Sequence, residues 1–237
     1  MRVTLFIPCL VDSFYPATGI AMVEILRRVG VEVDYRTSQT CCGQPAMNTG
    51  YRHDARAVAA RWLKVFDRSQ YIVAPSGSCV GMVRNLYNEL FEGGLSEDQK
   101  ALCARTFEFS EFLVKILKIY DVGARFEERV TYHDACHLLH ELGIKDEPRI
   151  LLRNVKGLEF VEMEDSTRCC GFGGTFAVKF PELSTVMVKQ KVAAIEKSGA
   201  RYVVANDSSC LMNIEGYLRR HQSMVKSIHL TEILARQ

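Results

Sequence analysis

The sequence contains one cysteine-bearing unit twice, and this duplication constrains the fold more than any other feature. Eight of the nine cysteines recur at matching positions of the two copies. In each copy a single cysteine is followed, after 31 or 32 residues, by the triplet Cys-Cys-Gly and later by one more cysteine. The eight are Cys9, Cys41, Cys42 and Cys79 in the first copy and Cys136, Cys169, Cys170 and Cys210 in the second. A repeat of roughly 125 residues is domain-sized and too long for the units of a solenoid.

The segments around the cysteines repeat as well. "VTLFIPC" corresponds to "VTYHDAC", "YIVAPSGSC" corresponds to "YVVANDSSC", and the endings "FEFSEFL" and "SIHLTEIL" are alike. A stretch near 92–106 occurs only in the first copy and contains the remaining cysteine, Cys103. The polar, glycine-containing stretch at 121–128 separates the copies. We therefore predict two domains, residues 1–122 and 123–237.

Within each copy, short runs of β-branched residues alternate with segments of helical periodicity. In the first copy such runs lie at 3–7, 31–35 and 71–74. Between the second and third runs, apolar residues recur at i, i+3, i+4, i+7 and i+8, which marks one buried face of a helix. They are Ala55, Val58, Ala59, Trp62, Leu63 and Phe66. The alternation predicts an α/β fold of two pseudo-equivalent halves, each a small parallel sheet flanked by helices.

Composition excludes several classes of protein. With 48% hydrophobic and 24% charged residues, the chain has an ordinary globular composition. A net charge of +2 without a basic tail or stripe argues against nucleic acid as a partner. No apolar run approaches the roughly 20 residues of a membrane span, and the N-terminus does not resemble a signal peptide. We expect a cytoplasmic protein, in which cysteines stay reduced and are ligands or redox groups more often than disulfides.

The cysteines follow the predicted strands. Cys9 follows the first strand, Cys41 and Cys42 follow the second, and Cys79 follows the third. Because parallel strands end at one edge of their sheet, four distant thiols of each half are expected to converge there. Adjacent residues of a strand point to opposite faces, so a Cys-Cys pair shares a target only from a tight turn. The glycine after each pair supplies the positive φ that such turns require.

Four converging thiols permit several interpretations. Cysteine can be a small buried hydrophobe, but recurrence at matching repeat positions argues against that. A four-cysteine zinc site usually draws ligand pairs from a C-x2–4-C knuckle, and a thiol–disulfide shuttle uses C-x-x-C; neither motif is present. Four soft thiolates are also the ligands of iron–sulfur clusters. The residues alone favour an iron–sulfur site while leaving zinc and thiol–disulfide chemistry open.

The duplicated pattern resembles the cysteine-rich CCG domain, which occurs in the cysteine-rich subunit of heterodisulfide reductase and in the iron–sulfur subunit of glycolate oxidase. Over its whole length, with "CCGQP", "PSGSC", "CCGFGGTF" and "SCLMNI", the chain is most similar to the lactate utilization protein A family. This resemblance implies a subunit of a cytoplasmic complex that oxidises L-lactate to pyruvate. It also implies two partners, a ferredoxin-type iron–sulfur protein and a third small subunit.

The resemblance further implies a cofactor, one or two 4Fe–4S clusters bound by the eight repeat cysteines. The related reductase subunit uses five cysteines per motif for a non-cubane cluster, the last two as C-x-x-C. Here Ser76 and Asp207 stand where the first cysteine of that pair would be. A four-thiolate cubane, or a cluster with an oxygen ligand from Ser76 or Asp207, fits these residues. The rival functions are a thiol/disulfide reductase subunit and a zinc-stabilised assembly protein without redox chemistry.

The two copies differ around their first cysteine. The first reads "FIPC", whereas the second reads "HDAC" and places His133 and Asp134 before Cys136. A histidine beside a carboxylate can accept the proton that lactate oxidation releases. We therefore predict His133 or Asp134 as a catalytic base. The alternative is that these groups cap the strand and helix ends or hydrogen-bond to cluster sulfurs.

Overall fold

Two parallel sheets with the same strand order form the framework of the chain. The computed structural model describes all 237 residues. The first sheet contains, in spatial order, β2 (Glu32–Tyr35), β1 (Arg2–Leu5), β3 (Ile72–Ala74) and β4 (Thr106–Glu108). The second contains β6 (Glu159–Phe160), β5 (Arg129–Tyr132), β7 (Tyr202–Ala205) and β8 (Lys226–His229). All neighbouring strands are parallel, which confirms the predicted α/β fold of two equivalent halves.

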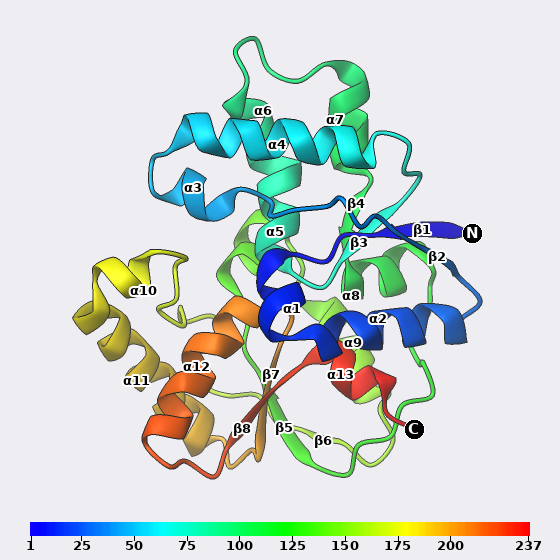
Figure 1. Cartoon of the computed structure of the whole chain (residues 1–237). Helices are drawn as coiled ribbons and strands as arrows, with labels where there is room; N and C mark the ends of the chain where they lie inside the picture. The colour runs from blue at the N-terminus through cyan, green and yellow to red at the C-terminus, as the bar shows by residue number, and fades with distance from the viewer.

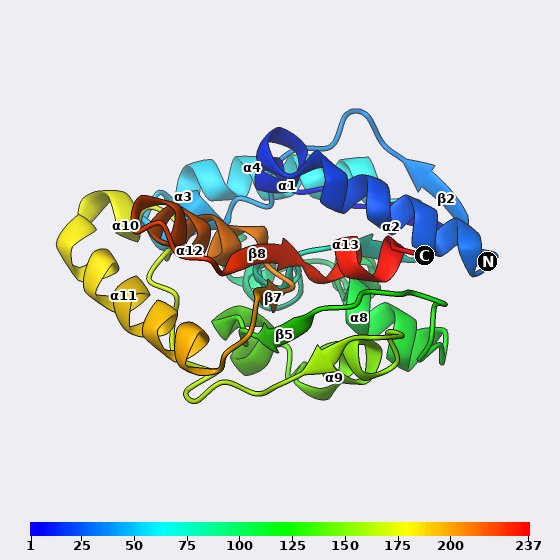
Figure 2. The same ribbon diagram turned by 90° about the horizontal axis from the view of Figure 1, so that it is seen from below.

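Helices flank both sheets (Figure 1). The first half contains α1 (Cys9–Phe14), α2 (Pro16–Arg28), α3 (Gln44–Asn48), α4 (Arg52–Phe66), α5 (Gly77–Gly81), α6 (Tyr87–Leu90), α7 (Glu97–Ala104) and α8 (Phe109–Glu111), with π-helical turns η1 (Met82–Leu86) and η2 (Phe112–Ile116). The second contains η3 (His137–Glu141), α9 (Asp146–Arg153), α10 (Phe176–Lys179), α11 (Pro181–Lys197), α12 (Ser208–Arg220) and α13 (Leu230–Ala235). Figures 1 and 2 both show α10 and α11 at the edge of the molecule farthest from the two termini.

Local sequence patterns account for the helices. The apolar stripe of the first half lies on α4, whose buried Trp62 and Phe66 pack against Phe6, the residue that directly follows β1. Pro16 occupies the first turn of α2, where its missing N–H costs nothing. Gly30 follows the end of α2 with φ of +79°, the left-handed conformation that glycine adopts most easily.

A shared apolar core holds the two halves together. The largest of three buried clusters has 26 residues and draws on both halves, whereas clusters of 17 and 12 residues belong to the first and second half respectively. Burying one large apolar side chain contributes roughly 1.5–3 kcal/mol. Because the largest cluster draws on both halves, burial of apolar side chains stabilises the contact between them. Residues 117–128 connect η2 to β5 with only an isolated β-bridge at Arg125, and the predicted division after residue 122 falls there.

The end of each half packs on the other half. Helix α13 lies against α2, and α8 lies against α9. Arg28 of α2 donates hydrogen bonds to the carbonyl oxygens of Leu234 and Ala235, at 3.2 and 2.6 Å. Both carbonyl groups lie in the last turn of α13, where a helix offers them no N–H donor. The guanidinium group of Arg28 supplies that donor from the other half.

Two equivalent buried side chains cross the interface. Glu108, at the end of β4, accepts a 3.0 Å hydrogen bond from the side-chain amide of Asn206 in the second half. His229, at the end of β8, places Nε2 3.0 Å from the carbonyl oxygen of Pro75 in the first half. Asn206 and Pro75 occupy matching positions in the loops that precede α12 and α5. The carboxyl edges of the two sheets are therefore fastened to each other.

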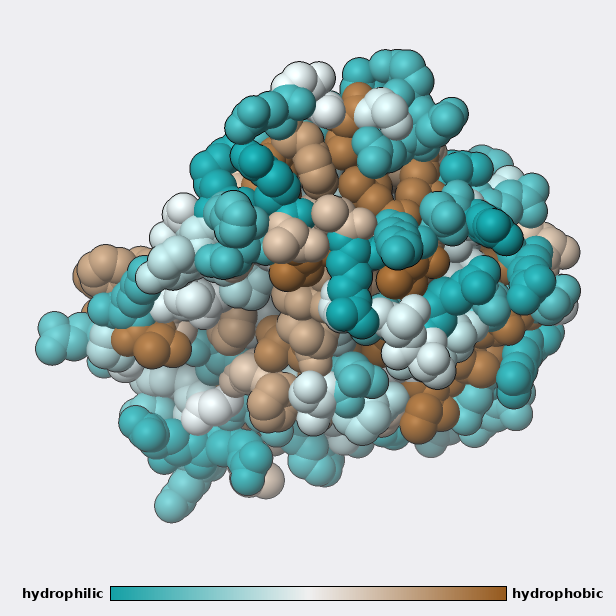
Figure 3. Space-filling model, turned by 45° about the horizontal axis from the view of Figure 1, so that its top comes forward, coloured by the Kyte–Doolittle hydropathy of each residue, from teal (hydrophilic) through white to brown (hydrophobic).

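The surface shows no continuous apolar face in the view of Figure 3, where hydrophobic side chains lie in separate patches among hydrophilic ones. No helix combines the length and the apolar character that crossing a membrane requires. The burial of apolar groups is thus concentrated in the cores within and between the halves.

The buried carboxyl group of Glu108 predicts a pH-dependent stability. Burial raises its pKa from 4.5 to about 7, against the hydrogen bonds from Ser110, Glu111 and Asn206. The folded chain then binds a proton that the unfolded chain has lost, so the free energy of unfolding falls as pH rises from about 4.5 to about 7. Relative to Glu108→Gln, the wild type should lose about 3 kcal/mol across this window.

Urea unfolding of both proteins between pH 4.5 and 8 measures this difference. Glu97→Gln, an exposed change on α7, is the control and should track the wild type. A gap between wild type and Glu108→Gln that stays constant with pH would contradict the expectation.

Candidate metal centre

All eight repeat cysteines line one cavity between the two halves. The cavity has a volume of about 260 Å³. The segments that follow β1, β3, β5 and β7 reach the cavity, where they contribute Pro8, Ser76, Ala135 and Asp207 to its lining. The carboxyl edges of the two sheets therefore meet across the interface between the halves.

Three separate segments position the thiols of the first half. Cys9 is the first residue of α1, Cys41 and Cys42 lie in the loop before α3, and Cys79 lies in α5. The Sγ atoms of Cys9 and Cys41 are 3.6 Å apart, and those of Cys42 and Cys79 are 3.4 Å apart. Residues separated by up to 70 positions in the sequence thus place their sulfur atoms in one group.

The second half repeats this arrangement. Cys136 immediately precedes η3, Cys169 and Cys170 lie in the loop before α10, and Cys210 lies in α12. Cys136 and Cys169 are neighbours that shift each other's pKa, and Cys170 and Cys210 do the same. The same two pairings, first with second and third with fourth, occur in both halves.

The glycine of each Cys-Cys-Gly triplet makes the turn that was predicted for it. Gly43 and Gly171 have φ of +87° and +83°. In both turns the glycine N–H donates to the sulfur of the first cysteine, with distances of 3.3 Å at Cys41 and 3.3 Å at Cys169. The left-handed residue therefore folds the backbone back onto its own thiol, and a side chain at that position would disfavour this conformation.

The thiols of the first half polarise one another. Hydrogen bonds from Cys42 and Cys9, helped by the amide of Gly43, lower the pKa of Cys41 to about 3. The pKa of Cys9, which is exposed, is raised chiefly by its hydrogen bond to the Cys41 sulfur, and the pKa of Cys42 is raised by its hydrogen bonds with Cys41 and Cys79 and by burial. Cys41 is therefore the thiolate of the first half, and the neighbouring thiols stabilise its negative charge.

The second half has the same pattern and one more thiolate. Hydrogen bonds from Cys136 and Cys170 and from the amide of Gly171 lower the pKa of Cys169 to about 2. Cys210 accepts from Cys170 and lies beside a histidine, which together lower its pKa to about 6 despite burial. Thiolate, not thiol, is the form that binds metal ions.

This donor set fits a thiolate-bound metal centre. All nine cysteines are free thiols. Two thiolates on one tetrahedral metal ion with bonds of about 2.3 Å lie about 3.8 Å apart, close to the separations of 3.6 and 3.4 Å between the sulfur atoms of the two pairs in the first half. Soft sulfur donors suit iron–sulfur clusters and zinc and do not suit magnesium or calcium. Cys103 lies apart, buried in the core of the first half, where burial raises its pKa to about 12.

Ser76 and Asp207 line the cavity and also link the two halves. Each precedes the helix that carries the last cysteine of its half, and each caps that helix with its side chain. One carboxylate oxygen of Asp207 accepts a 2.8 Å hydrogen bond from the N–H of Ser78, and it lies 3.5 Å from the hydroxyl of Ser76. The other accepts from the hydroxyl of Ser209 at 2.6 Å. Both residues thus hold the cysteine-bearing helices in place from the cavity wall.

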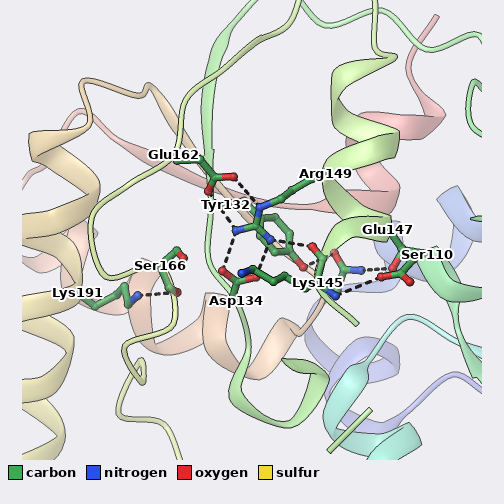
Figure 4. A network of polar contacts seen from close by, with 10 residues as sticks. Ser110, Tyr132, Asp134, Lys145, Glu147, Arg149, Glu162, Ser166 and Lys191 are labelled. Atoms are coloured by element: carbon green, nitrogen blue, oxygen red, sulfur yellow. Dashed lines mark hydrogen bonds and ion pairs between the residues drawn. The ribbon is translucent and has the colours of Figure 1, made fainter. Parts of the chain in front are cut away.

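Neither His133 nor Asp134 lines the cavity. Asp134 is buried and forms two hydrogen bonds with the guanidinium of Arg149, at 2.7 and 2.8 Å (Figure 4). Arg149 also contacts Glu162 and stacks over the ring of Tyr132. Burial would raise the pKa of Asp134, but the hydrogen bonds from Arg149 outweigh it and lower the pKa. The catalytic role of these two residues stays a prediction.

His137 lines the cavity, although it was not among the site residues predicted from the sequence. The Nδ1 atom of His137 lies 3.5 Å from the Cys136 sulfur, and its Nε2 atom lies 3.6 Å from Glu141. Gln44 also lines the cavity and donates to the carbonyl oxygen of Ser78 at 3.1 Å. The only signal for either was its place within two residues of a cysteine, which does not tell which way a side chain points.

Comparison with known proteins identifies the class to which this site belongs. The model of the cysteine-rich domain family CCG matches residues 3–84 and again residues 130–215. The chain is therefore a protein of the cysteine-rich CCG class, with one domain match in each half.

Full-length relatives narrow the class. The chain is 48% identical to lactate utilization protein A of Oceanobacillus iheyensis, covering 99% of this chain and 96% of that protein. It is 46% identical to lactate utilization protein A 2 of Bacillus cereus strain AH820, covering 100% and 98%. The chain belongs to the lactate utilization protein A family.

One solved structure shares the fold. A hypothetical protein from Helicobacter pylori aligns with a TM-score of 0.63 at 11% identity. The alignment covers 98% of this chain and 48% of that one, so this chain spans about half of its length. At this identity the likeness extends to the fold alone.

The turn at Gly171 predicts a local cost for any side chain. A Cβ atom there would lie 2.8 Å from the carbonyl oxygen of Ser184, and φ is +83°. Gly171→Ala should lower the free energy of unfolding by about 1–3 kcal/mol. Urea unfolding measures it, with Gly216→Ala as control, because nothing lies within 4 Å of a Cβ there. Equal losses in both variants would contradict this account.

The buried pair of Arg149 and Asp134 predicts a larger cost. Arg149→Met leaves the Asp134 carboxylate buried without its partner, which should destabilise the chain by about 3–5 kcal/mol. Adding Asp134→Asn should recover part of that loss, since the unpaired charge is gone. The exposed Arg153→Met on the same helix is the control, and urea unfolding of the four proteins gives the values. A loss below about 1 kcal/mol for Arg149→Met would show that the pair is not structural.

Proposed function

We propose that the chain is an iron–sulfur electron-transfer subunit of a cytoplasmic complex that oxidises L-lactate to pyruvate. The observation that carries this proposal is the convergence of eight thiols, four from each half, on one cavity. Membership of the lactate utilization protein A family supports the substrate. The absence of C-x-x-C knuckles from the sequence favours iron–sulfur ligation over zinc.

We assign two ligand sets to the cavity. One or two 4Fe–4S clusters are held by Cys9, Cys41, Cys42 and Cys79 and by Cys136, Cys169, Cys170 and Cys210. Ser76 and Asp207 line the same cavity and are the candidate oxygen ligands. A bound cluster supplies one-electron transfer. The hydrogen bonds from the Gly43 and Gly171 amides fall on sulfur, and they stabilise the negative charge that thiolate ligands carry.

The oxidation of lactate also requires acceptors for the electrons and protons that it releases. Oxidation of the lactate hydroxyl carbon releases two electrons and two protons. We assign the electrons to a ferredoxin-type iron–sulfur partner, which acts in the complex with a third small subunit. His137, an imidazole on the cavity wall, is placed to accept a proton. His133 and Asp134, the bases predicted from the sequence, have no surface on that cavity.

Metal and sulfide analysis after strictly anaerobic purification tests the proposal. About eight iron and eight acid-labile sulfide per chain are expected for two 4Fe–4S clusters, and about four of each for one. The double variants Cys41→Ser/Cys42→Ser and Cys169→Ser/Cys170→Ser should each lose the content of one half. Cys103→Ser should keep all of it, because Cys103 lies in the core away from the cavity. Zinc without sulfide would overturn electron transfer and leave the thiols as structural ligands.

A further inference from the structure

A fully buried histidine of the second half has no nitrogen or oxygen partner in the protein. The backbone N–H of His133, directly after β5, donates to the carbonyl oxygen of Val204 at 2.8 Å. Its side chain is 0% exposed, and neither Nδ1 nor Nε2 has a hydrogen-bond partner of normal geometry. Burying an unpaired imidazole costs free energy, and buried polar groups are nearly always paired. The ring's polar neighbour within the protein is the Cys210 sulfur, a weak hydrogen-bond acceptor, so the imidazole has no partner of normal geometry.

The surroundings of the ring indicate which kind of partner it lacks. One ring nitrogen of His133 and the sulfur atoms of Cys170 and Cys210 all lie within 4.8 Å of one another. Bonds of about 2.1 Å from metal to nitrogen and 2.3 Å from metal to sulfur together span up to about 4.4 Å. A metal ion shared by these three atoms thus requires only small side-chain movements.

The backbone around His133 fixes the direction of its ring. Neighbouring side chains along an extended chain point to opposite sides. Tyr132 and Asp134 lie on the side of Arg149, which holds both of them. His133 therefore faces the other side, toward the core that contains Cys170 and Cys210.

The first half has no counterpart to this imidazole. Phe6 occupies the equivalent position, since "TLFIPC" aligns with "TYHDAC". Its ring makes edge contacts with Trp62 and Phe66, at centroid distances of 5.7 and 5.6 Å. An apolar residue fills this position in one copy, so the backbone does not require a polar one. The imidazole is specific to the second site.

We propose that His133 is a nitrogen ligand of the metal centre in the second half, beside the thiolates of Cys136, Cys169, Cys170 and Cys210. The centre of the first half is bound by thiolates without imidazole. Neutral imidazole is a common ligand of iron, which makes His133 suited to the task. The inference rests on the proposed cluster-binding function, and it makes the two sites chemically unequal.

Pulsed EPR of the reduced, anaerobically purified chain tests the ligand directly. In protein labelled with 15N-histidine alone, a strong 15N hyperfine coupling is expected. The coupling should disappear in His133→Phe, which copies the residue of the first half. It should persist in His140→Gln, an exposed histidine on η3, and in His137→Gln, whose ring lies beside Cys136.

The outcomes separate this inference from the function on which it rests. A chain without iron and sulfide overturns the proposed function. A chain with clusters but without histidine coupling overturns the role of His133 and leaves the function standing. Coupling lost in His137→Gln instead would overturn the role of His133 and assign the ligand to His137. If His133→Phe fails to fold, the labelled wild type still decides whether a histidine binds, and His133→Gln with the two control variants decides which.

Discussion

The apolar core between the two halves is the contact on which the site depends. Neither sheet alone brings more than four of the repeat cysteines to its edge, and each edge opens toward the other half. The shared core, the packing of α13 on α2 and the contacts of Glu108 and His229 hold the two edges face to face. Because the residues that fasten the edges lie next to the cysteine-bearing loops, stability of the interface and geometry of the site are coupled.

Within each half, the turn at the Cys-Cys-Gly triplet places the thiols of both adjacent cysteines beside the other thiols of the site. The left-handed glycine turns the chain so that both cysteines of the pair reach neighbouring thiols, and its N–H stabilises the first sulfur. Thiols that donate to one another concentrate negative charge on Cys41 and Cys169. The protein thus arranges donors for a positively charged centre before any metal binds, which lowers the reorganisation needed on binding.

The two copies share the features that set the backbone geometry of the site, and they differ in the side chains around the first cysteine. Strand order, the glycine turns and the cap residues before α5 and α12 are equivalent. The environment of the first cysteine is not, since an aromatic cluster around Phe6 is replaced by His133 and the Asp134–Arg149 pair. A duplicated fold can carry two unequal sites in this way without any change in strand order.

The sequence alone determined the duplication, the parallel α/β halves and the two groups of four cysteines, because periodicity and spacing are local properties of a chain. It also indicated the turns after the cysteine pairs, since glycine is the residue that adopts the left-handed conformation most easily. Only the tertiary structure decided that both groups share one cavity, that Asp134 belongs to an ion pair and that His137 faces the cavity. Side-chain direction at a strand end and contacts between halves depend on packing between distant residues, and no local pattern records them.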